Sequence, residues 1–263
     1  MTDHLVDTGA NLTHNSFDDD RDQVIERAAN AGVTRIIVTG TSDQNSQNAL
    51  ALAKTRPGKL FSTAGVHPHH ASDYSSSVKA TLAKLMREDT VVAVGECGLD
   101  YFRNFSPREV QLSAFQSQLE LAAESGLPVF LHQREAHKDF VEILKPMINK
   151  ISAAVAHCFT DSRDALHDYL SMGLYIGVTG WICDERRGQM LRKIVADIPL
   201  DRLMIETDAP YLLPRTLNPK PKMRRNEPMY LTEVLRTVAE AMETPTTTIA
   251  KETSANAERV FGL

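Results

Sequence analysis

Short strand-like segments alternate with helix-like segments along the whole of this 263-residue chain. The strand-like segments are apolar and rich in β-branched residues, a pattern typical of parallel strands that are buried on both faces. Several helix-like segments end at glycine or proline, as at Gly32, Pro57 and Gly173. Eight strands are therefore expected, at residues 4–7, 35–39, 60–66, 91–95, 128–131, 153–156, 174–179 and 203–207.

The helix after the fourth of these strands has the clearest boundaries. Ser106-Pro107-Arg108-Glu109 combines an N-cap serine, a proline at the first helical position and a capping-box acid. Gly126 follows as a stop at the other end. The other helices are expected near residues 18–31, 42–55, 78–87, 136–148, 164–172, 185–198, 227–242, 246–252 and 255–261.

Eight β/α repeats in a chain of this length predict an α/β protein with the (β/α)8 TIM-barrel fold. The last three helices are expected to cover the barrel. A doubly wound open sheet is the alternative, but no GxGxxG phosphate-binding sequence follows the first strand. No linker or shift in composition divides the chain, so we expect a single domain over residues 1–263.

The composition is that of an ordinary globular protein, with 42% hydrophobic and 24% charged residues. The start of the chain lacks the features of a signal peptide, and no apolar run approaches the ~20 residues of a membrane span. The three cysteines have no framework spacing and fit a reducing compartment. We therefore expect a cytoplasmic protein without a membrane partner. The net charge of −5 disfavours nucleic acid on average, although the distribution of charge matters more than its sum.

Residues 91–100 place an acid at the end of an apolar run. Glu96 lies between Gly95 and Gly98, where the fourth strand is expected to end. A carboxylate in that position is costly to desolvate unless a cation or hydrogen-bond donors meet it. Glycines allow the backbone to come close to a ligand. A solvated acid at a strand end is the alternative interpretation.

Other metal-binding side chains recur at the ends of the expected strands. In a (β/α)8 barrel these ends converge on one mouth, where catalytic residues lie. Each histidine alone is well explained as a strand-end residue bonded to a neighbouring carbonyl, but packing does not explain the recurrence. Imidazoles and carboxylates together suit a divalent metal with an open position, which serves hydrolysis. The residues at these positions are Asp7, His67, Glu96, His132, His157 and Asp208.

Five ordered motifs give the chain a family resemblance over its whole length: residues 63–69 (TAGVHPH), 95–100 (GECGLD), 128–132 (PVFLH), 157–160 (HCFT) and 205–212 (IETDAPYL). On these motifs the chain resembles the TatD-type metal-dependent deoxyribonucleases of the amidohydrolase superfamily. The resemblance implies a barrel fold and metal-dependent hydrolysis of phosphodiester bonds. The implied enzyme is a 3′-5′ exonuclease that acts on single-stranded DNA, with RNA as a further substrate, and that takes part in DNA repair.

The resemblance also implies roles for individual residues. Glu96, His132 and His157 would be metal ligands, and Asp208 would be a ligand or the base that orients the attacking water. His67 would face substrate or metal, so the implied catalytic residues are Asp208, Glu96 and His67. Mg²⁺ is the expected metal, with Mn²⁺ and Zn²⁺ as alternatives, and a monomer is expected.

The chain departs from the family pattern at the end of the first strand. Most members carry His-x-His there, but this chain has Gly9 and Asn11 at the corresponding positions. Glycine offers no ligand atom, and the asparagine offers one weak oxygen donor. We therefore expect one tightly held ion on Glu96, His132 and His157, with room for a loosely held Mg²⁺ beside it.

Basic side chains are expected around the same mouth. The loop at 215–225 contains five basic residues and no acid. Arginine matches phosphate oxygens bidentately, and phosphate contacts supply most of the sequence-independent affinity for nucleic acid. A solvated loop with scattered charge is the alternative. The expected substrate-binding residues are Arg103, Arg186, Arg215, Arg224 and Arg225.

Aromatic residues and cysteines near the mouth allow two interpretations. Phe102, Trp181 and Tyr211 lie on the expected loops, where they either stack on bases or pack. Strand alternation turns Cys97 and Cys158 toward the surrounding helices, so both are expected to be packing thiols.

Two other functions remain open from the sequence. One is a metal-dependent barrel hydrolase of a small ester, amide or phosphoester, because one barrel fold hosts many reactions. The other is a non-catalytic relative that binds nucleic acid, since the first-strand ligands are missing. Replacing the basic residues of the 215–225 loop with neutral ones distinguishes the small-molecule hydrolase from a nuclease. A small-molecule enzyme should tolerate that change.

Overall fold

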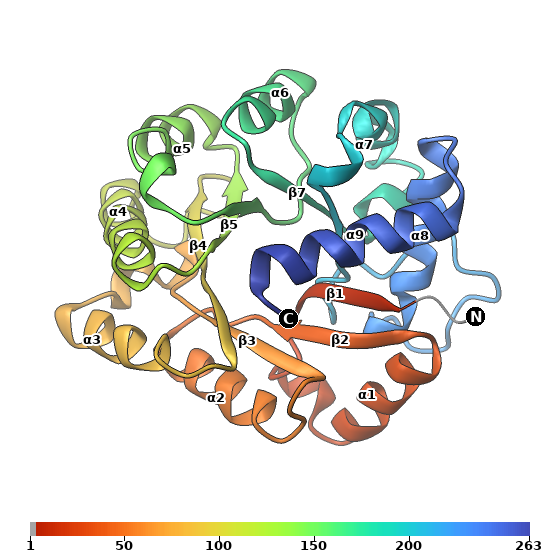
Figure 1. Ribbon diagram of the computed structural model, residues 1–263, viewed down its shortest axis with the longest axis horizontal. Coiled ribbons are helices and arrows are strands. Elements are labelled where there is room, and N and C mark those ends of the chain that lie inside the picture. The colour runs from red at the N-terminus through yellow and green to blue at the C-terminus, as the bar shows by residue number, and fades with distance from the viewer. Residues whose placement is uncertain (1–3) are drawn as a thin grey trace.

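The computed structural model describes residues 4–263 and contains a parallel sheet of eight strands in the order β1 to β8. Helices form a ring outside the strands, which confirms the predicted TIM barrel (Figure 1). The strands are β1 (Leu5–Ala10), β2 (Val33–Val38), β3 (Leu60–Ala64), β4 (Val91–Asp100), β5 (Val129–Arg134), β6 (Ala154–Ala156), β7 (Tyr175–Val178) and β8 (Leu203–Ile205).

Each strand except the last leads to the next through at least one helix. None of the helices within residues 4–263 is long and apolar enough to cross a bilayer. The helices are α1 (Arg21–Asn30), α2 (Asp43–Ala53), α3 (Ser76–Leu85), α4 (Arg108–Ser125), α5 (His137–Leu144), α6 (Arg163–Ser171), α7 (Gln189–Ile194), α8 (Leu231–Ala241) and α9 (Thr246–Phe261).

Strand alternation produces two separate cores. Val129 and Leu131 of β5 lie in the larger core between the strands and the helices. Phe130, between them, lies in a smaller core inside the barrel. Phe261 of α9 belongs to this inner core, so α9 closes one end of the barrel, across which it lies in Figure 1.

Helix α9 corrects one prediction about the tail of the chain. The sequence predicts two helices, at 246–252 and 255–261, but the structure has one continuous helix. The amide of Asn256 donates to the carbonyls of Leu200 (2.7 Å) and Leu203 (2.8 Å) at the start of β8. Polar residues in the middle of α9 therefore bond to the barrel and do not end the helix.

The seam between β8 and β1 is closed mainly by side chains. Asp7 is fully buried and accepts hydrogen bonds from Thr207 N (2.9 Å), Thr207 Oγ1 (2.5 Å) and Gly9 N (3.3 Å). Burial raises the pKa of Asp7 to about 7 against these bonds, which lower it. Asp7 therefore joins two strands inside the barrel and does not line the mouth, contrary to the prediction that grouped it with the metal-binding residues.

Strand β4 is longer than predicted. It continues beyond Gly95 to Asp100, so Glu96 lies within the strand and Asp100 is its last residue. Gly98 has φ of 141°, and a Cβ atom there would lie 1.9 Å from the His132 carbonyl oxygen of β5. Glycine at this position lets the two strands pack closely where their functional side chains emerge.

The start of α4 also differs from the prediction. The helix begins at Arg108, and the Ser106 side chain does not cap it. Ser106 Oγ instead accepts from Ser72 N (3.1 Å) and donates to His69 O (3.2 Å). Ser106 therefore holds the loop after β3 against the loop after β4. The predicted stop at Gly126 is confirmed, with φ of 74°.

Candidate metal centre

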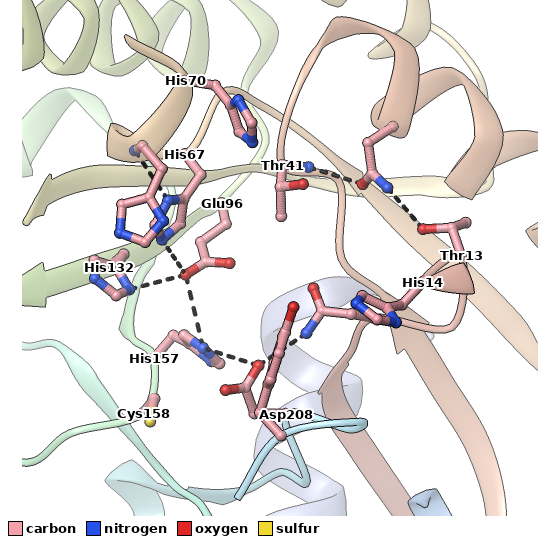
Figure 2. A pocket seen from close by; sticks show the side chains of 14 residues that line it. Thr13, His14, Thr41, His67, His70, Glu96, His132, His157, Cys158 and Asp208 are labelled. Carbon is pink, nitrogen blue, oxygen red and sulfur yellow. Dashed lines mark hydrogen bonds and ion pairs between the residues drawn. The ribbon is translucent and has the colours of Figure 1, made fainter. Parts of the chain in front are cut away.

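A hollow of about 310 Å³ lies at the C-terminal ends of the strands. His67 lies beyond β3, Glu96 lies on β4, His132 on β5, and His157 and Asp208 follow β6 and β8. Figure 2 shows the three imidazoles and Asp208 gathered around the Glu96 carboxylate. The structure thus brings together the side chains that the sequence predicts as catalytic or metal-binding, with the exception of Asp7.

Glu96 is the centre of this arrangement. Its Oε1 atom lies 3.0 Å from His132 Nδ1, 3.4 Å from His67 Nε2 and 3.8 Å from His157 Nε2. Burial favours the neutral acid, but the surrounding imidazoles outweigh it and hold the pKa of Glu96 well below its usual range. Glu96 is therefore an ionised carboxylate with only 5% of its surface exposed.

His132 lies between two carboxylates. Its Nδ1 faces Glu96, and its Nε2 is 3.5 Å from Asp100 Oδ2. Burial lowers the pKa of His132, but Asp100 and Glu96 outweigh burial and raise it overall. Asp100 also lies 2.8 Å from His69 Nε2. Asp100 is not predicted as a site residue, because the predicted strand ends at Gly95. In the longer strand, alternation from Glu96 places Asp100 on the same face.

Glu206 is the other carboxylate that the sequence analysis missed. Its Oε2 atom lies 2.8 Å from His157 Nδ1, and its Oε1 accepts the Cys158 amide at 2.5 Å. Glu206 is completely buried. Burial lowers the pKa of His157, but Glu206 and Glu96 outweigh burial and raise it to about 10. Glu206 precedes Asp208 by two residues, and this close spacing of two acids after β8 is the sequence signal for a second carboxylate at the site.

Asp208 has a left-handed backbone, with φ of 54°, at the turn after β8. Its Oδ1 accepts the Asn11 amide at 2.9 Å and lies 3.9 Å from His157 Nε2. Burial raises the pKa of Asp208 to about 7, against the opposing charge of His157. A carboxyl group with such a pKa changes its protonation near neutrality, which suits a proton acceptor.

His67 has a defined orientation because it caps a short helix at Pro68–Asp73. Its Nδ1 accepts the His69 amide at 3.1 Å, so the neutral ring carries its proton on Nε2. Burial lowers the pKa of His67 to about 4, so the ring is neutral at physiological pH. His67 therefore offers an N–H donor toward the hollow, which suits an oxygen of Glu96 or of a phosphate.

A histidine at position 9 of the first strand would crowd the side chains around His157. A Cβ atom on Gly9 would lie 2.9 Å from Phe130 Cζ and 3.1 Å from Glu206 Oε2. The space that a side chain at this position would need is taken by the groups that support His157. Asn11 uses its amide to bond to Asp208.

The donor set fits a divalent cation. Two groups of three side chains each bring their ligand atoms within 4.8 Å of one another. One group is His67, Glu96 and His132, and the other is His157, Cys158 and Asp208. His132 faces Glu96 with Nδ1 and Asp100 with Nε2, so Nδ1 is the nitrogen available at the centre of the group. Imidazole nitrogens and carboxylate oxygens around one point are the ligands that Zn²⁺, Mn²⁺ and related ions take.

Cys158 corrects a prediction about the thiols. Cys97 lies in the core between strands and helices, as predicted. Cys158 instead lines the hollow, because its backbone is left-handed, with φ of 47°, and strand alternation no longer applies. Its Sγ atom lies 3.4 Å from Thr179 Oγ1.

The structure places Arg225 differently from the other predicted substrate-binding residues. Its guanidinium donates to Asp20 (2.7 Å) and to Glu227 (2.8 Å), and it also bonds to the Ser16 carbonyl oxygen. Its side chain is only 12% exposed. Arg225 therefore anchors the loop after β8 to α1.

The remaining predicted arginines are accessible. Arg215 pairs with Glu185 at 2.7 Å, and Arg186 lies 3.7 Å from Asp184. Two of them are exposed and form no ion pair with any residue in 4–263, namely Arg103 and Arg224. Loops at the mouth thus offer cations that are free for an anionic ligand.

A parallel (β/α)8 barrel with imidazoles and carboxylates gathered at its C-terminal mouth defines a metal-dependent hydrolase. The family model described as TatD related DNase matches residues 6–262, and the chain belongs to this family.

Relatives resemble the chain over its full length. The "3'-5' ssDNA/RNA exonuclease TatD" of Erwinia tasmaniensis is 53% identical over 259 residues, which cover 98% of this chain and 100% of the relative. The protein of the same name from Pectobacterium carotovorum is 51% identical over 259 residues, which again cover 98% of this chain and 100% of the relative. Among solved structures, the TatD homologue YJJV from Escherichia coli has a TM-score of 0.91 at 30% identity, with both chains fully covered.

Proposed function

We propose that the chain is a metal-dependent 3′-5′ exonuclease that shortens single-stranded DNA or RNA. The observation that carries this proposal is the buried, ionised Glu96 with three imidazole nitrogens within 3.8 Å of one of its oxygens. The substrate and the direction of attack come from the names of relatives whose sequences are 53% and 51% identical to this chain. In this proposal the chain acts in the cytoplasm as a monomer and forms one domain over residues 1–263.

Glu96, His132, His157 and Asp208 would hold the metal, with Mg²⁺ foremost. When bound, such an ion lowers the pKa of water and polarises a phosphoryl oxygen. Glu206 and Asp100 orient the His157 and His132 rings through their second nitrogens, so both imidazoles face the hollow.

The protein's own groups supply the remaining functions. Asp208, which lines the hollow beside His157, accepts the proton of the water that attacks phosphorus. His67 donates its Nε2 proton in a hydrogen bond to a phosphate oxygen, and its neutral state makes this donation independent of pH above about 5. Arg103, Arg186, Arg215 and Arg224 bind phosphates of the strand.

The first test is degradation of an end-labelled single-stranded oligonucleotide with Mg²⁺, with Mn²⁺ or with EDTA. We expect stepwise shortening from the 3′ end with either metal and none with EDTA. Glu96→Ala and His157→Ala should each lose at least 100-fold in rate while the far-ultraviolet dichroism is unchanged. The matched controls are Glu88→Ala and His167→Ala, because these exposed side chains lie outside the hollow.

Three results would contradict the proposal. An unchanged rate in Glu96→Ala would remove Glu96 from the reaction. Hydrolysis of small phosphoesters or carboxylic esters, with an intact oligonucleotide under every metal, would favour the small-molecule hydrolase. Binding of the oligonucleotide without any hydrolysis would favour the non-catalytic relative.

A further inference from the structure

A second hollow of about 450 Å³ adjoins the candidate metal centre. The segment after β8 borders both hollows, because Tyr211 lines the metal centre and Leu212 lines the neighbour. We call this second hollow the rim groove. The two hollows therefore border the same turn of the chain.

The rim groove carries a surplus of positive charge. Its only carboxylate among the lining residues is Asp184, and this group already accepts the Arg186 and Arg187 amides and Arg187 Nε. These bonds hold the pKa of Asp184 at about 2 against its burial, so it is fully ionised and paired. The cationic residues that line the groove are Arg187, Arg215, Lys220 and Arg224.

Trp181 separates the rim groove from a smaller hollow, and it lines both. Two guanidinium groups lie on its ring, with Arg187 at 4.3 Å and Arg134 at 5.2 Å from the centroid. Arg134 also lies 4.7 Å from the exposed ring of Phe102. Contact with an aromatic ring fixes the plane of a guanidinium. Arg187 uses its Nε on Asp184 and keeps its two terminal N–H groups for a ligand.

Arg134 is notable because it is half-buried without an anionic partner. Glu135 and Asp161 line the same small hollow, yet neither forms an ion pair with it in the part of the chain from residue 4 to 263. Asp161 instead accepts from Gln133 at 2.8 Å. A guanidinium held between two aromatic rings and lacking a carboxylate is prepared to receive an oxyanion from outside.

We infer that Arg134 and Arg187, held by Trp181, bind the backbone phosphates of the nucleotides that precede the 3′ end. This inference rests on the proposed function, because it takes the 3′-terminal nucleotide to occupy the hollow beside Glu96. Contacts to phosphates carry no sequence information, so the site binds any single strand. Trp181 is a positioning residue that orients both guanidinium groups.

The single tryptophan of the chain provides the experiment. Titration of the full chain with a ten-residue oligothymidylate in EDTA avoids hydrolysis. We expect a saturable change in Trp181 emission, in step with the anisotropy of a fluorescein-labelled strand. Arg134→Gln should weaken binding about tenfold, the loss of a charge-assisted phosphate contact, and should reduce the slope of log K against log salt by about 0.7.

Arg202→Gln is the matched control. Arg202 also lies over an aromatic ring, at 5.0 Å from the centroid of Tyr175, but Tyr175 begins β7 at the opposite end of the strand from Trp181. We expect this variant to bind the strand with unchanged affinity and salt slope. Trp181→Leu, followed by anisotropy alone, should weaken binding at least as much as Arg134→Gln.

Three results would overturn the inference: no binding of the strand, binding without a change in Trp181 emission, or equal effects of Arg134→Gln and Arg202→Gln. Failure of the proposed function looks different. If the strand binds at Trp181 but is not shortened with Mg²⁺ or Mn²⁺, the phosphate site stands and the exonuclease does not.

Discussion

At the scale of single residues, the candidate metal centre pairs imidazoles with carboxylates. His157 faces Glu96 with one nitrogen and Glu206 with the other, and His132 lies in the same way between Glu96 and Asp100. A carboxylate behind an imidazole fixes the orientation of the ring and raises its basicity as a ligand. The buried acids outside the hollow are therefore as informative as those inside it.

Glu206→Gln tests this arrangement. The amide keeps the shape of the side chain but removes its charge, so we expect metal affinity and exonuclease rate to fall about 10–100-fold. Calorimetric titration with Mn²⁺ measures the affinity, and end-labelled oligonucleotide measures the rate. Glu88→Gln, at an exposed side chain outside the hollow, is the control. Wild-type affinity in Glu206→Gln would show that Glu206 only fills space.

Neighbouring arginines provide a second test at this scale. Arg224 is exposed and lines the rim groove, whereas Arg225 is paired with Asp20 and Glu227. Arg224→Gln should weaken binding of single-stranded DNA without changing stability. Arg225→Gln should lower the free energy of unfolding by about 2–3 kcal/mol, because it leaves charged hydrogen-bond partners unsatisfied. Urea unfolding and anisotropy measure the two effects, and an exchange of the two outcomes would refute the assignment.

At the scale of elements, the seam between β8 and β1 depends on Asp7 and Thr207. The folded chain releases the Asp7 proton at pH about 7, whereas an exposed aspartate releases it near pH 3.8. The folded state therefore binds more protons between these values, and the contribution of Asp7 to stability falls as the pH rises through them.

Thr207→Val tests the seam by removing one donor to Asp7 without changing the shape of the side chain. The lost hydrogen bond favours the charged carboxylate, so the variant should raise the pKa of Asp7 further. We expect a loss of about 1–3 kcal/mol at pH 8 and a smaller loss at pH 5, measured by urea unfolding. Thr207→Ser keeps the hydroxyl and serves as the control. Equal losses at the two pH values would contradict this interpretation.

The sequence predicts elements well where the signal is local, and less well where a tertiary contact decides. Apolar runs and glycine stops locate all eight strands and the end of α4 at Gly126. The length of β4 depends on its pairing with β5, and the continuity of α9 depends on Asn256 bonding to the barrel. Ser106 resembles a cap, but a neighbouring loop binds its hydroxyl.

At the scale of the whole molecule, the net charge of −5 conceals a basic rim. The barrel fold explains why the sequence predicts the candidate site, since parallel strands bring their ends to one mouth. Glu96, His132, His157 and Asp208 were found because each follows or ends an apolar run. The supporting acids Glu206 and Asp100 are harder to predict from the sequence. Their roles depend on contacts with His157 and His132, which lie far away along the chain.

An ion-pair network joins the two halves of the chain and should make stability depend on acid. Arg225 and Arg27 hold the pKa of Asp20 at about 2, below the 3.8 of an exposed aspartate. The unfolded state therefore binds this proton first as the pH falls, and the stabilisation is present above pH 4 and lost toward pH 2.

Asp20→Asn should lower the free energy of unfolding by about 1 kcal/mol at pH 7, because the network is partly exposed. The difference from the unchanged chain should shrink as the pH falls from 4 to 2. Urea unfolding over this range measures it. A constant difference would show that the charge of Asp20 has no part in the effect.

Gly9 determines which side chains fit beside His157. A side chain at position 9 would collide with Phe130 and with the Glu206 carboxylate that supports His157. A histidine at this position must therefore displace the Phe130 ring or the Glu206 carboxylate from its present place beside His157. A first-strand histidine and the present support of His157 thus compete for the same space inside this barrel.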